Sequence, residues 1–443
     1  MPESSLKNEL TGIVGGENAV DDPRLLEPFT VEGIKPGIAL FPKNIEQISE
    51  IMKAASRAKA CVIPMGSGTK RALGNRPSGV DIVLSTRKLN RVVEHESADL
   101  VATTECGIAL SELNAGLGVK NQFLPVDPPH IAAGATVGGI IATNDSGPLR
   151  LRYGTARELL IGMKVVRPDG SVFKGGSKVV KNVAGYDLPK LFVGSLGTLG
   201  IIAEATFRLY PVPESSRTYF AAFESLDEAH DTVRSLIDSN LVINALEHMN
   251  PALAGGLAGS YGPGQDISRY SIAVRIMNVS RAVDDQMKTV VGITQGNGGN
   301  GFMIEGEKEE AFWKDVREFP WMPLDSPYAV LKAGLLISEV PRIFLALERL
   351  ADKFGIRARA SARAANGVVI ISVAGANETV LTAVKELREF SESAGGSLVV
   401  SEASPDIKPG IDVWGTIGSS LNMMKRIKSG FDPGNILNPG RLF

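Results

Sequence analysis

The chain has 443 residues, with 47 Lys and Arg against 49 Asp and Glu, so its net charge is −2. This balance excludes a nucleic-acid binder that relies on phosphate neutralisation, because such proteins carry a basic excess. The length favours two or three domains. The chain's 2 cysteines cannot ligate an iron–sulfur cluster, which usually needs four thiolates.

The N-terminal residues 1–10 contain neither the basic nor the apolar run of a secretory signal. No long apolar stretch occurs, so we expect no transmembrane helix. Cys61 and Cys106 are expected to be reduced, partly buried thiols, which fits a cytoplasmic protein. Any association with a membrane would then go through partner proteins.

The first half of the chain predicts alternating strands and helices after a leader of residues 1–35. Asn44 precedes apolar residues at helical spacing, and Gln47 stands in the capping-box position, so a helix is expected to start at Ile45. Short apolar runs predict strands at residues 38–41, 61–63, 82–84, 100–103, 159–166, 172–173 and 200–209.

After Pro213 a second pattern begins, in which strands and helices again alternate. The strands are predicted near residues 218–223, 242–248, 271–279 and 368–373, and the helices at 226–239, 281–294, 340–354, 378–394 and 419–429. This order favours an α+β domain on an antiparallel sheet. Gly255–Gly264 and Gly292–Gly301 are interpreted as glycine-rich loops.

The segment Gly66–Thr69 directly follows a predicted strand. Glycine lets backbone N–H groups approach an anion closely, and Lys70 and Arg71 add positive charge. The segment is neither a dinucleotide fingerprint, because Arg71 replaces the third glycine, nor a P-loop, because Thr69 precedes the lysine. Taken alone, it fits a pyrophosphate cradle and a tight turn equally well.

Two further segments follow in order. In residues 135–147 the paired glycines Gly138 and Gly139 lack side chains, so a flat ligand could lie against the backbone. The other segment comprises residues 181–188 and continues into 192–202. Within it, Tyr186 and Asp187 are interpreted as structural turn residues rather than acid–base groups.

This ordered set resembles the FAD-binding domain of the vanillyl-alcohol oxidase / p-cresol methylhydroxylase family (PCMH-type) over residues 36–212, and Leu437–Gly440 is also typical. Within the family the chain is most similar to an FAD-binding subunit of glycolate oxidases. Leu331–Gly334, Asp412–Gly415 and Phe431–Phe443 carry that similarity.

The resemblance implies an α+β fold: a two-subdomain PCMH-type FAD-binding domain plus an α+β cap domain with an antiparallel sheet. The implied organisation is a leader (1–35), the FAD-binding domain (36–212), the cap (213–410) and a C-terminal segment (411–443) that returns to the FAD domain.

The implied cofactor is FAD. We expect it to be non-covalent, because the first loop contains Ser67 and no histidine, and Cys106 offers only a remote alternative. The residues expected to bind it are Pro64, Gly66, Ser67, Gly68, Thr69, Lys70, Pro128, Thr136, Gly138, Gly139, Thr143, Asn144, Ser146, Gly147, Gly197, Gly200, Ile201 and Ile202.

No metal site is expected. The closest of the four histidines, His230 and His248, are 18 residues apart, so no local pair exists, although a distant pair could meet in the fold. We expect the histidines to be exposed or hydrogen-bonded. Arg357, Arg359 and Arg363 could bind a substrate carboxylate, or could be solvated strand and loop cations. No catalytic base stands out.

The resemblance implies the FAD-binding component of a 2-hydroxy-acid dehydrogenase complex of the glycolate or lactate type. A sister FAD-linked oxidase subunit would oxidise the small 2-hydroxy acid, and an iron–sulfur subunit would accept electrons. One alternative is a self-sufficient FAD-dependent dehydrogenase with a metal-free site between its domains. The other is a scaffold that has lost flavin.

Overall fold

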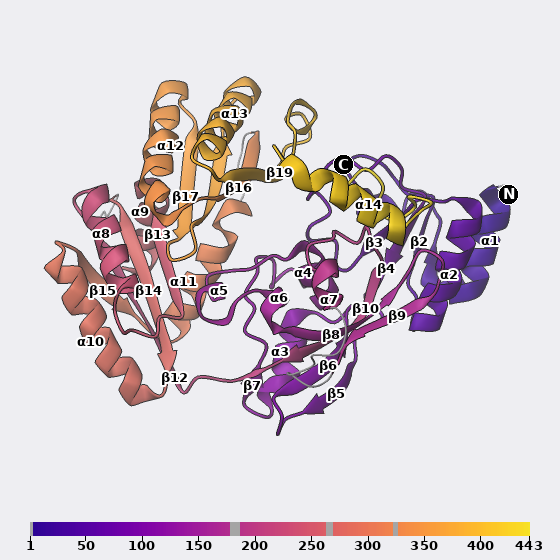
Figure 1. Ribbon diagram of the computed structural model, residues 1–443, viewed down its shortest axis with the longest axis horizontal. Helices are drawn as coiled ribbons and strands as arrows, with labels where there is room; N and C mark the ends of the chain where they lie inside the picture. Colours follow the sequence, from indigo (N-terminus) through magenta and orange to yellow (C-terminus); the bar gives the residue numbers. More distant parts are fainter. Residues whose placement is uncertain (1–2, 178–186, 263–268, 322–326) are drawn as a thin grey trace. The chain divides into compact units, whose positions relative to one another are not determined.

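The computed structural model describes residues 3–177, 187–262, 269–321 and 327–443. The chain divides into two units (Figure 1). Unit 1 comprises residues 1–146, 154–212 and 417–443, and unit 2 comprises residues 147–153 and 213–416. The chain therefore leaves unit 1 and returns to it twice.

The first subdomain of unit 1 is a four-stranded sheet in the order β1-β2-β4-β3, in which β2, β4 and β3 are parallel. Its elements are α1 (Glu3–Val14), β1 (Ala19–Val20), β2 (Ile38–Leu40), α2 (Ile45–Ala58), β3 (Val62–Met65) and β4 (Ile82–Ser85). Asn44 caps α2 by accepting from Gln47 N, as predicted, whereas the Gln47 side chain accepts from Lys43 N.

The second subdomain is an antiparallel sheet in the order β5-β6-β10-β8-β9. Its strands are β5 (Val92–Glu96), β6 (Val101–Glu105), β8 (Leu160–Val166), β9 (Val172–Gly176) and β10 (Ile201–Arg208), with a short pair β7 (Gln122–Phe123) and β11 (Tyr210–Pro211). Unit 1 also contains helices α3 (Leu110–Gly118), α4 (Val137–Thr143), α6 (Ala156–Leu159), α7 (Pro189–Phe192) and α14 (Leu421–Phe431).

Unit 2 is built on an eight-stranded antiparallel sheet in the order β15-β12-β14-β13-β17-β18-β16-β19. Its strands are β12 (Ser215–Ala222), β13 (Ala245–Met249), β14 (Ser271–Asn278), β15 (Asn300–Ile304), β16 (Tyr328–Gly334), β17 (Arg357–Arg363), β18 (Val368–Ala374) and β19 (Ser397–Ala403). The structure thus confirms the predicted antiparallel sheet.

One face of this sheet packs against four amphipathic helices, α8 (Leu226–Ile237), α10 (Ser280–Gly296), α12 (Val340–Phe354) and α13 (Asn377–Ser393). On the other face, α9 (Pro251–Tyr261) and α11 (Glu307–Glu318) form an apolar core with the β12–β14–β13 part. The short helix α5 (Arg150–Tyr153) completes unit 2. None of the described helices is long and apolar enough to cross a membrane.

Both predictions of a glycine-rich loop were wrong. The described part of Gly255–Gly264 lies mostly in α9, which Asn250 caps by accepting from Leu253 N. In the second run, residues up to Gly296 belong to α10, and β15 begins at Asn300. In both cases apolar residues at helical spacing, or strand pairing, outweigh the glycine content.

Candidate functional site

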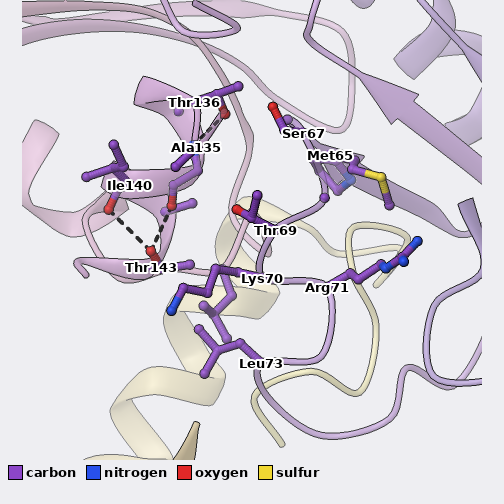
Figure 2. Close-up of a pocket in the computed structure, with 18 of the residues that line it drawn as sticks. Met65, Ser67, Thr69, Lys70, Arg71, Leu73, Ala135, Thr136, Ile140 and Thr143 are labelled. Atoms are coloured by element: carbon purple, nitrogen blue, oxygen red, sulfur yellow. Dashed lines mark hydrogen bonds between the residues drawn. The ribbon is translucent and has the colours of Figure 1, made fainter. Parts of the chain in front are cut away.

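Unit 1 contains a cavity of about 1010 Å³, counting its solvent-open part, with walls contributed by both subdomains. One wall is the loop after β3 (Figure 2), and the other comprises α4 and the segment that leads into β10. The C-terminal residues Asn438 and Arg441 complete the lining.

The loop of residues 66–73 approaches α4 closely because its first residue is glycine. A β-carbon at Gly66 would lie 2.0 Å from Thr136 Oγ1, and Gly68 adopts a positive φ of 75°. Ser67 Oγ donates to Gly134 O at 2.5 Å, which ties the loop to the segment before α4. A side chain at position 66 would therefore push the two walls apart.

The hydroxyls of Thr136 and Thr143 both bond within α4. Thr136 Oγ1 accepts from Gly139 N at 3.3 Å, and Thr143 Oγ1 donates to Gly139 O at 2.8 Å (Figure 2). Gly138 N donates to Cys106 O at 2.7 Å. The last bond fixes the helix to the residue that follows β6, and the threonine bonds hold the helix itself together.

Lys70 and Arg71 extend from the loop in opposite directions (Figure 2). Arg71 donates to Pro28 O, whereas Lys70 Nζ lies 2.7 Å from Asp145 Oδ2 on the opposite wall. Burial, together with the charge of Lys70, lowers the pKa of nearby His130 to about 4, so this imidazole is neutral at pH 7. Both cations of the loop line the cavity, and Lys70 is the one that reaches the opposite wall.

The cavity gathers all but three of the residues predicted to bind the cofactor. The exceptions are Asn144, Ser146 and Gly147. Asn144 is the left-handed C-cap of α4, Ser146 is buried, and Gly147 begins the segment that belongs to unit 2. Of the predicted segment 181–188, residues 181–186, including Tyr186, lie outside the described residues.

Sequence reasoning missed four polar lining residues, Thr86, Asp145, Asn438 and Arg441. Asp145 stands between two residues that were predicted, so its acidic side chain was an available signal. The family resemblance implied that the tail returns to the FAD domain, but no tail residue was named as part of the site. The tail's contacts with the cavity walls span most of the chain, which no local pattern reveals.

In unit 2, the three candidate arginines share one face of β17. Ala358, Ala360 and Ala362 alternate with them and face the helix-covered core. Burial lowers the pKa of Arg359, and the charge of Arg357 lowers it further. Arg359 Nη2 is buried and has no hydrogen-bond partner within the described structure.

Two carboxylates share this face of the sheet with the arginines. Glu247 on β13 lies directly across from Arg363, and its Oε2 accepts from Ser361 Oγ at 2.5 Å. Glu402 on β19 accepts from Trp321 Nε1 at 2.9 Å and from the Tyr328 hydroxyl at 2.6 Å. Both carboxylates are therefore engaged by neutral donors.

Lys332 on β16 adds a fourth cation to the three arginines. It shares their face, because it is opposite Ile370, which is opposite Ser361. Among the described residues of β13 and β16–β19, this face thus carries four cations and two carboxylates.

No group of three His, Cys, Asp or Glu residues in the described part of the chain could hold a metal ion. His248 nevertheless differs from the expectation of exposed or hydrogen-bonded histidines. It is fully buried, neither ring nitrogen has a hydrogen-bond partner in the described residues, and its ring centroid lies 6.4 Å from that of His230. The two most closely spaced histidines of the sequence therefore do meet.

Two family models cover most of the chain. An "FAD binding domain" matches residues 36–176, and an "FAD linked oxidases, C-terminal domain" matches residues 212–399 and 418–442. The chain belongs to the FAD-linked oxidase family. Its cofactor is FAD, and it is an FAD-dependent oxidoreductase, as the sequence resemblance implied.

Relatives of this FAD-linked oxidase align along nearly its whole length. Glycolate oxidase subunit GlcD of Bacillus subtilis is 28% identical over 100% of this chain and 97% of its own. A D-lactate dehydrogenase of Archaeoglobus fulgidus is 29% identical over 95% of this chain and 94% of its own. A D-2-hydroxyglutarate dehydrogenase of Stutzerimonas stutzeri is 25% identical over 100% of both.

Solved structures confirm the fold. Substrate-bound p-cresol methylhydroxylase superposes with a TM-score of 0.79 at 18% identity, covering 99% of this chain and 96% of that one. Alkyldihydroxyacetonephosphate synthase gives a TM-score of 0.79 at 20% identity, covering 98% of this chain and 84% of that one. The fold is therefore PCMH-type, as predicted.

The cavity of unit 1 fits FAD chemically. Gly66 leaves room that a β-carbon would fill, and Lys70 supplies a cation for a pyrophosphate. Apolar side chains suited to a flat ring line the remainder, among them Ile63, Met65, Ile140, Ile201 and Ile202.

Gly66→Ala is expected to raise the Kd for FAD about 10- to 100-fold, because forcing a methyl group into a packed site costs roughly 1–3 kcal/mol. Titration of the apoprotein with FAD, followed by quenching of flavin fluorescence, measures this. Gly116→Ala is the control, since a β-carbon there meets nothing within 4 Å. An unchanged Kd for Gly66→Ala would place the cofactor elsewhere.

Proposed function

We propose that this chain oxidises a small 2-hydroxy acid, with non-covalent FAD in the cavity of unit 1. The observation that carries the proposal concerns Arg359 on β17, whose Nη2 is buried and has no hydrogen-bond partner among the described residues. A guanidinium binds a carboxylate through two parallel hydrogen bonds, and every 2-hydroxy acid carries a carboxylate. The activities named for the relatives, on glycolate, D-lactate and D-2-hydroxyglutarate, support the same substrate class.

Residues of unit 2 would bind and orient the substrate. Arg359 would hold the carboxylate through its buried guanidinium. Holding the carboxylate fixes the direction of the neighbouring hydroxyl-bearing carbon. When bound, FAD supplies a two-electron acceptor.

Non-covalent attachment is supported by the side chains around the cavity. Ser67 Oγ is occupied by its bond to Gly134 O. Cys106 is fully buried, and burial raises the pKa of its thiol well above the usual value, so the nucleophilic thiolate does not form at neutral pH. Release of intact FAD on acid denaturation tests this part of the proposal.

Arg359→Met is expected to lower kcat/KM about 10- to 100-fold for the accepted 2-hydroxy acid, mainly through KM, because charge-assisted bonds contribute roughly 1.5–3 kcal/mol. Steady-state assays of the isolated chain with glycolate, D-lactate and D-2-hydroxyglutarate and a dye acceptor measure it. Arg349→Met, at an exposed position on α12, is the control. Unchanged kinetics in Arg359→Met would remove Arg359 from the substrate site.

A second candidate is that the chain acts as one component of a complex, with a sister FAD-linked oxidase subunit and an iron–sulfur subunit. Its 2 cysteines cannot hold a cluster, so electrons would leave the flavin for another protein. A holoprotein that binds FAD, turns over no 2-hydroxy acid alone, and co-purifies with such partners would favour this role. A colourless protein that takes up no FAD would favour a scaffold.

A further inference from the structure

We infer that the C-terminal tail, residues 435–441, is a clamp that controls how long FAD stays bound, and that Arg441 is its positioning residue. The inference rests on the proposed placement of FAD in the cavity of unit 1. It concerns residues near the end of the chain that touch both walls of that cavity.

The tail attaches to β3, the strand that leads into the loop of residues 66–73. Val62 N donates to Ile436 O at 2.8 Å, and Asn438 N donates to Val62 O at 2.9 Å. Leu437 thereby forms a parallel bridge with Val62 at β3, which is the edge strand of its sheet. The tail thus covers an otherwise open sheet edge directly before Gly66.

Arg441 then binds the far end of the same loop. Its Nη1 donates to Asn75 O at 2.8 Å, its second terminal nitrogen donates to Arg71 O, and Asn75 N donates back to Arg441 O at 3.0 Å. One residue therefore closes the loop that carries Lys70. Figure 2 shows the yellow C-terminal segment passing beside this loop.

Asn438 extends the clamp to the opposite wall. Its Nδ2 donates to Leu196 O at 2.6 Å, and Leu196 holds a positive φ of 52° next to Gly197. Both Leu196 and Gly197 line the cavity. The tail therefore ties the loop of the first subdomain to the segment that leads into β10 of the second.

A buried ion pair anchors the beginning of the tail. Lys428 Nζ donates to Asp432, to Thr198 O at 2.8 Å and to Leu437 O at 2.9 Å. Asp432 in turn accepts from Leu437 N at 2.8 Å. Because these bonds do not involve Arg441, we expect the tail to stay attached to unit 1 when Arg441 is changed.

Arg441 is suited to respond to a bound anion. Arg441 is 3% exposed, and the two loop groups that accept its hydrogen bonds are neutral backbone carbonyls. Burial lowers its pKa to about 10, so the guanidinium remains charged at pH 7 in the cavity wall. The charge of Glu32 already acts on this guanidinium, and the FAD pyrophosphate would add a further anion that stabilises the buried cation.

The test uses the full-length holoprotein and compares Arg441→Met and Arg441→Lys with the wild type. We expect the FAD dissociation rate of Arg441→Met to rise about 10- to 100-fold, because charge-assisted bonds that order the loop are lost. Arg441→Lys keeps the charge but lacks the planar guanidinium that donates to two carbonyls. Its FAD dissociation rate should therefore lie between those of the wild type and Arg441→Met. Arg426→Met, at an exposed position of α14, should leave the rate unchanged.

A second readout separates a clamp from a purely structural residue. Loss of a clamp reduces the gain in Tm that FAD gives to the apoprotein, whereas loss of a structural residue lowers the apo and holo Tm values equally. If Arg441→Met fails to fold, Asn438→Ala carries the same expectation. If the wild type binds no FAD, the proposed function is overturned. If the wild type binds FAD and the variants release it at the same rate, only the clamp is overturned.

Discussion

Arg275→Met is expected to lower the free energy of unfolding of unit 2 by about 3–5 kcal/mol, because it leaves a buried carboxylate without its cation. Arg275 Nε lies 3.1 Å from Glu309 Oε1, and the two side chains are only 5% and 3% exposed. Glu309 also accepts from the hydroxyls of Ser216 and Thr218. The ion pair therefore joins α11 to β12 and β14 at the centre of a desolvated network.

Urea denaturation followed by tryptophan fluorescence measures this loss, since Trp313, Trp321 and Trp414 are the chain's 3 tryptophans and all belong to unit 2. Glu310→Gln is the control. Glu310 also contacts Arg275, but its side chain is 68% exposed, so we expect a change below about 1 kcal/mol.

The double variant Arg275→Met/Glu309→Leu sharpens the test. Replacing both charges by apolar groups removes the uncompensated carboxylate, so most of the stability should return. If the double variant is as unstable as the sum of the two single variants, the loss comes from packing, not from the unpaired charge.

Helices and strands with strong local patterns were predictable from the sequence. The helix predicted at residues 340–354 is α12, and its residues Ile343, Phe344, Leu347 and Leu350 are buried on one face. Such elements follow from periodicity, because an amphipathic helix presents its apolar face to whatever sheet it meets. The arginines of β17 also alternate with alanines at strand spacing, but no strand was predicted there.

The helix α9 could not be predicted from its glycines, and the reason is tertiary. Its cap Asn250 accepts from Ala360 N and donates to Ala358 O on β17, so a strand more than 100 residues away fixes where the helix begins. Leu253 and Leu257 are then buried against the sheet. Packing of these residues outweighs the low helix propensity of glycine.

For the cofactor site, the glycine loops were visible in the sequence, but what holds them was not. Arg441 contacts Arg71 and Asn75, which lie 370 and 366 residues earlier in the chain. The same limit applies to His248. A gap of 18 residues between two histidines cannot show that α8 and β13 bring their rings together.

His248 should make unit 2 sensitive to acid. Burial, with a smaller contribution from the charge of His230, lowers its pKa from 6.5 to about 3. The titratable groups around it are His230 on α8, Tyr270 ahead of β14 and Glu348 on α12, whose carboxylate accepts from the Tyr270 hydroxyl at 2.5 Å. No described group supplies an anion directly to the His248 ring.

The direction of the effect follows from where the proton binds. Above pH 6.5 the ring is neutral in both the folded and the unfolded chain, so His248 adds no pH dependence there. As the pH falls below 6.5 the unfolded chain takes up a proton that the folded chain refuses until about pH 3, so stability is lost. Between pH 7 and pH 5 this loss amounts to about 2 kcal/mol.

His248→Leu is therefore expected to remove this loss and to raise the free energy of unfolding at pH 7 by about 1–2 kcal/mol. The reason is that an apolar group replaces a buried ring N–H that has no acceptor among the described residues. Urea titrations at several pH values, read by tryptophan fluorescence, measure both effects. Phe344→Leu is the control: its ring lies 5.1 Å from that of His248, and it carries no titratable group, so it should lower stability equally at every pH. If His248→Leu loses stability with pH as steeply as the wild type, acid acts on unit 2 through another group.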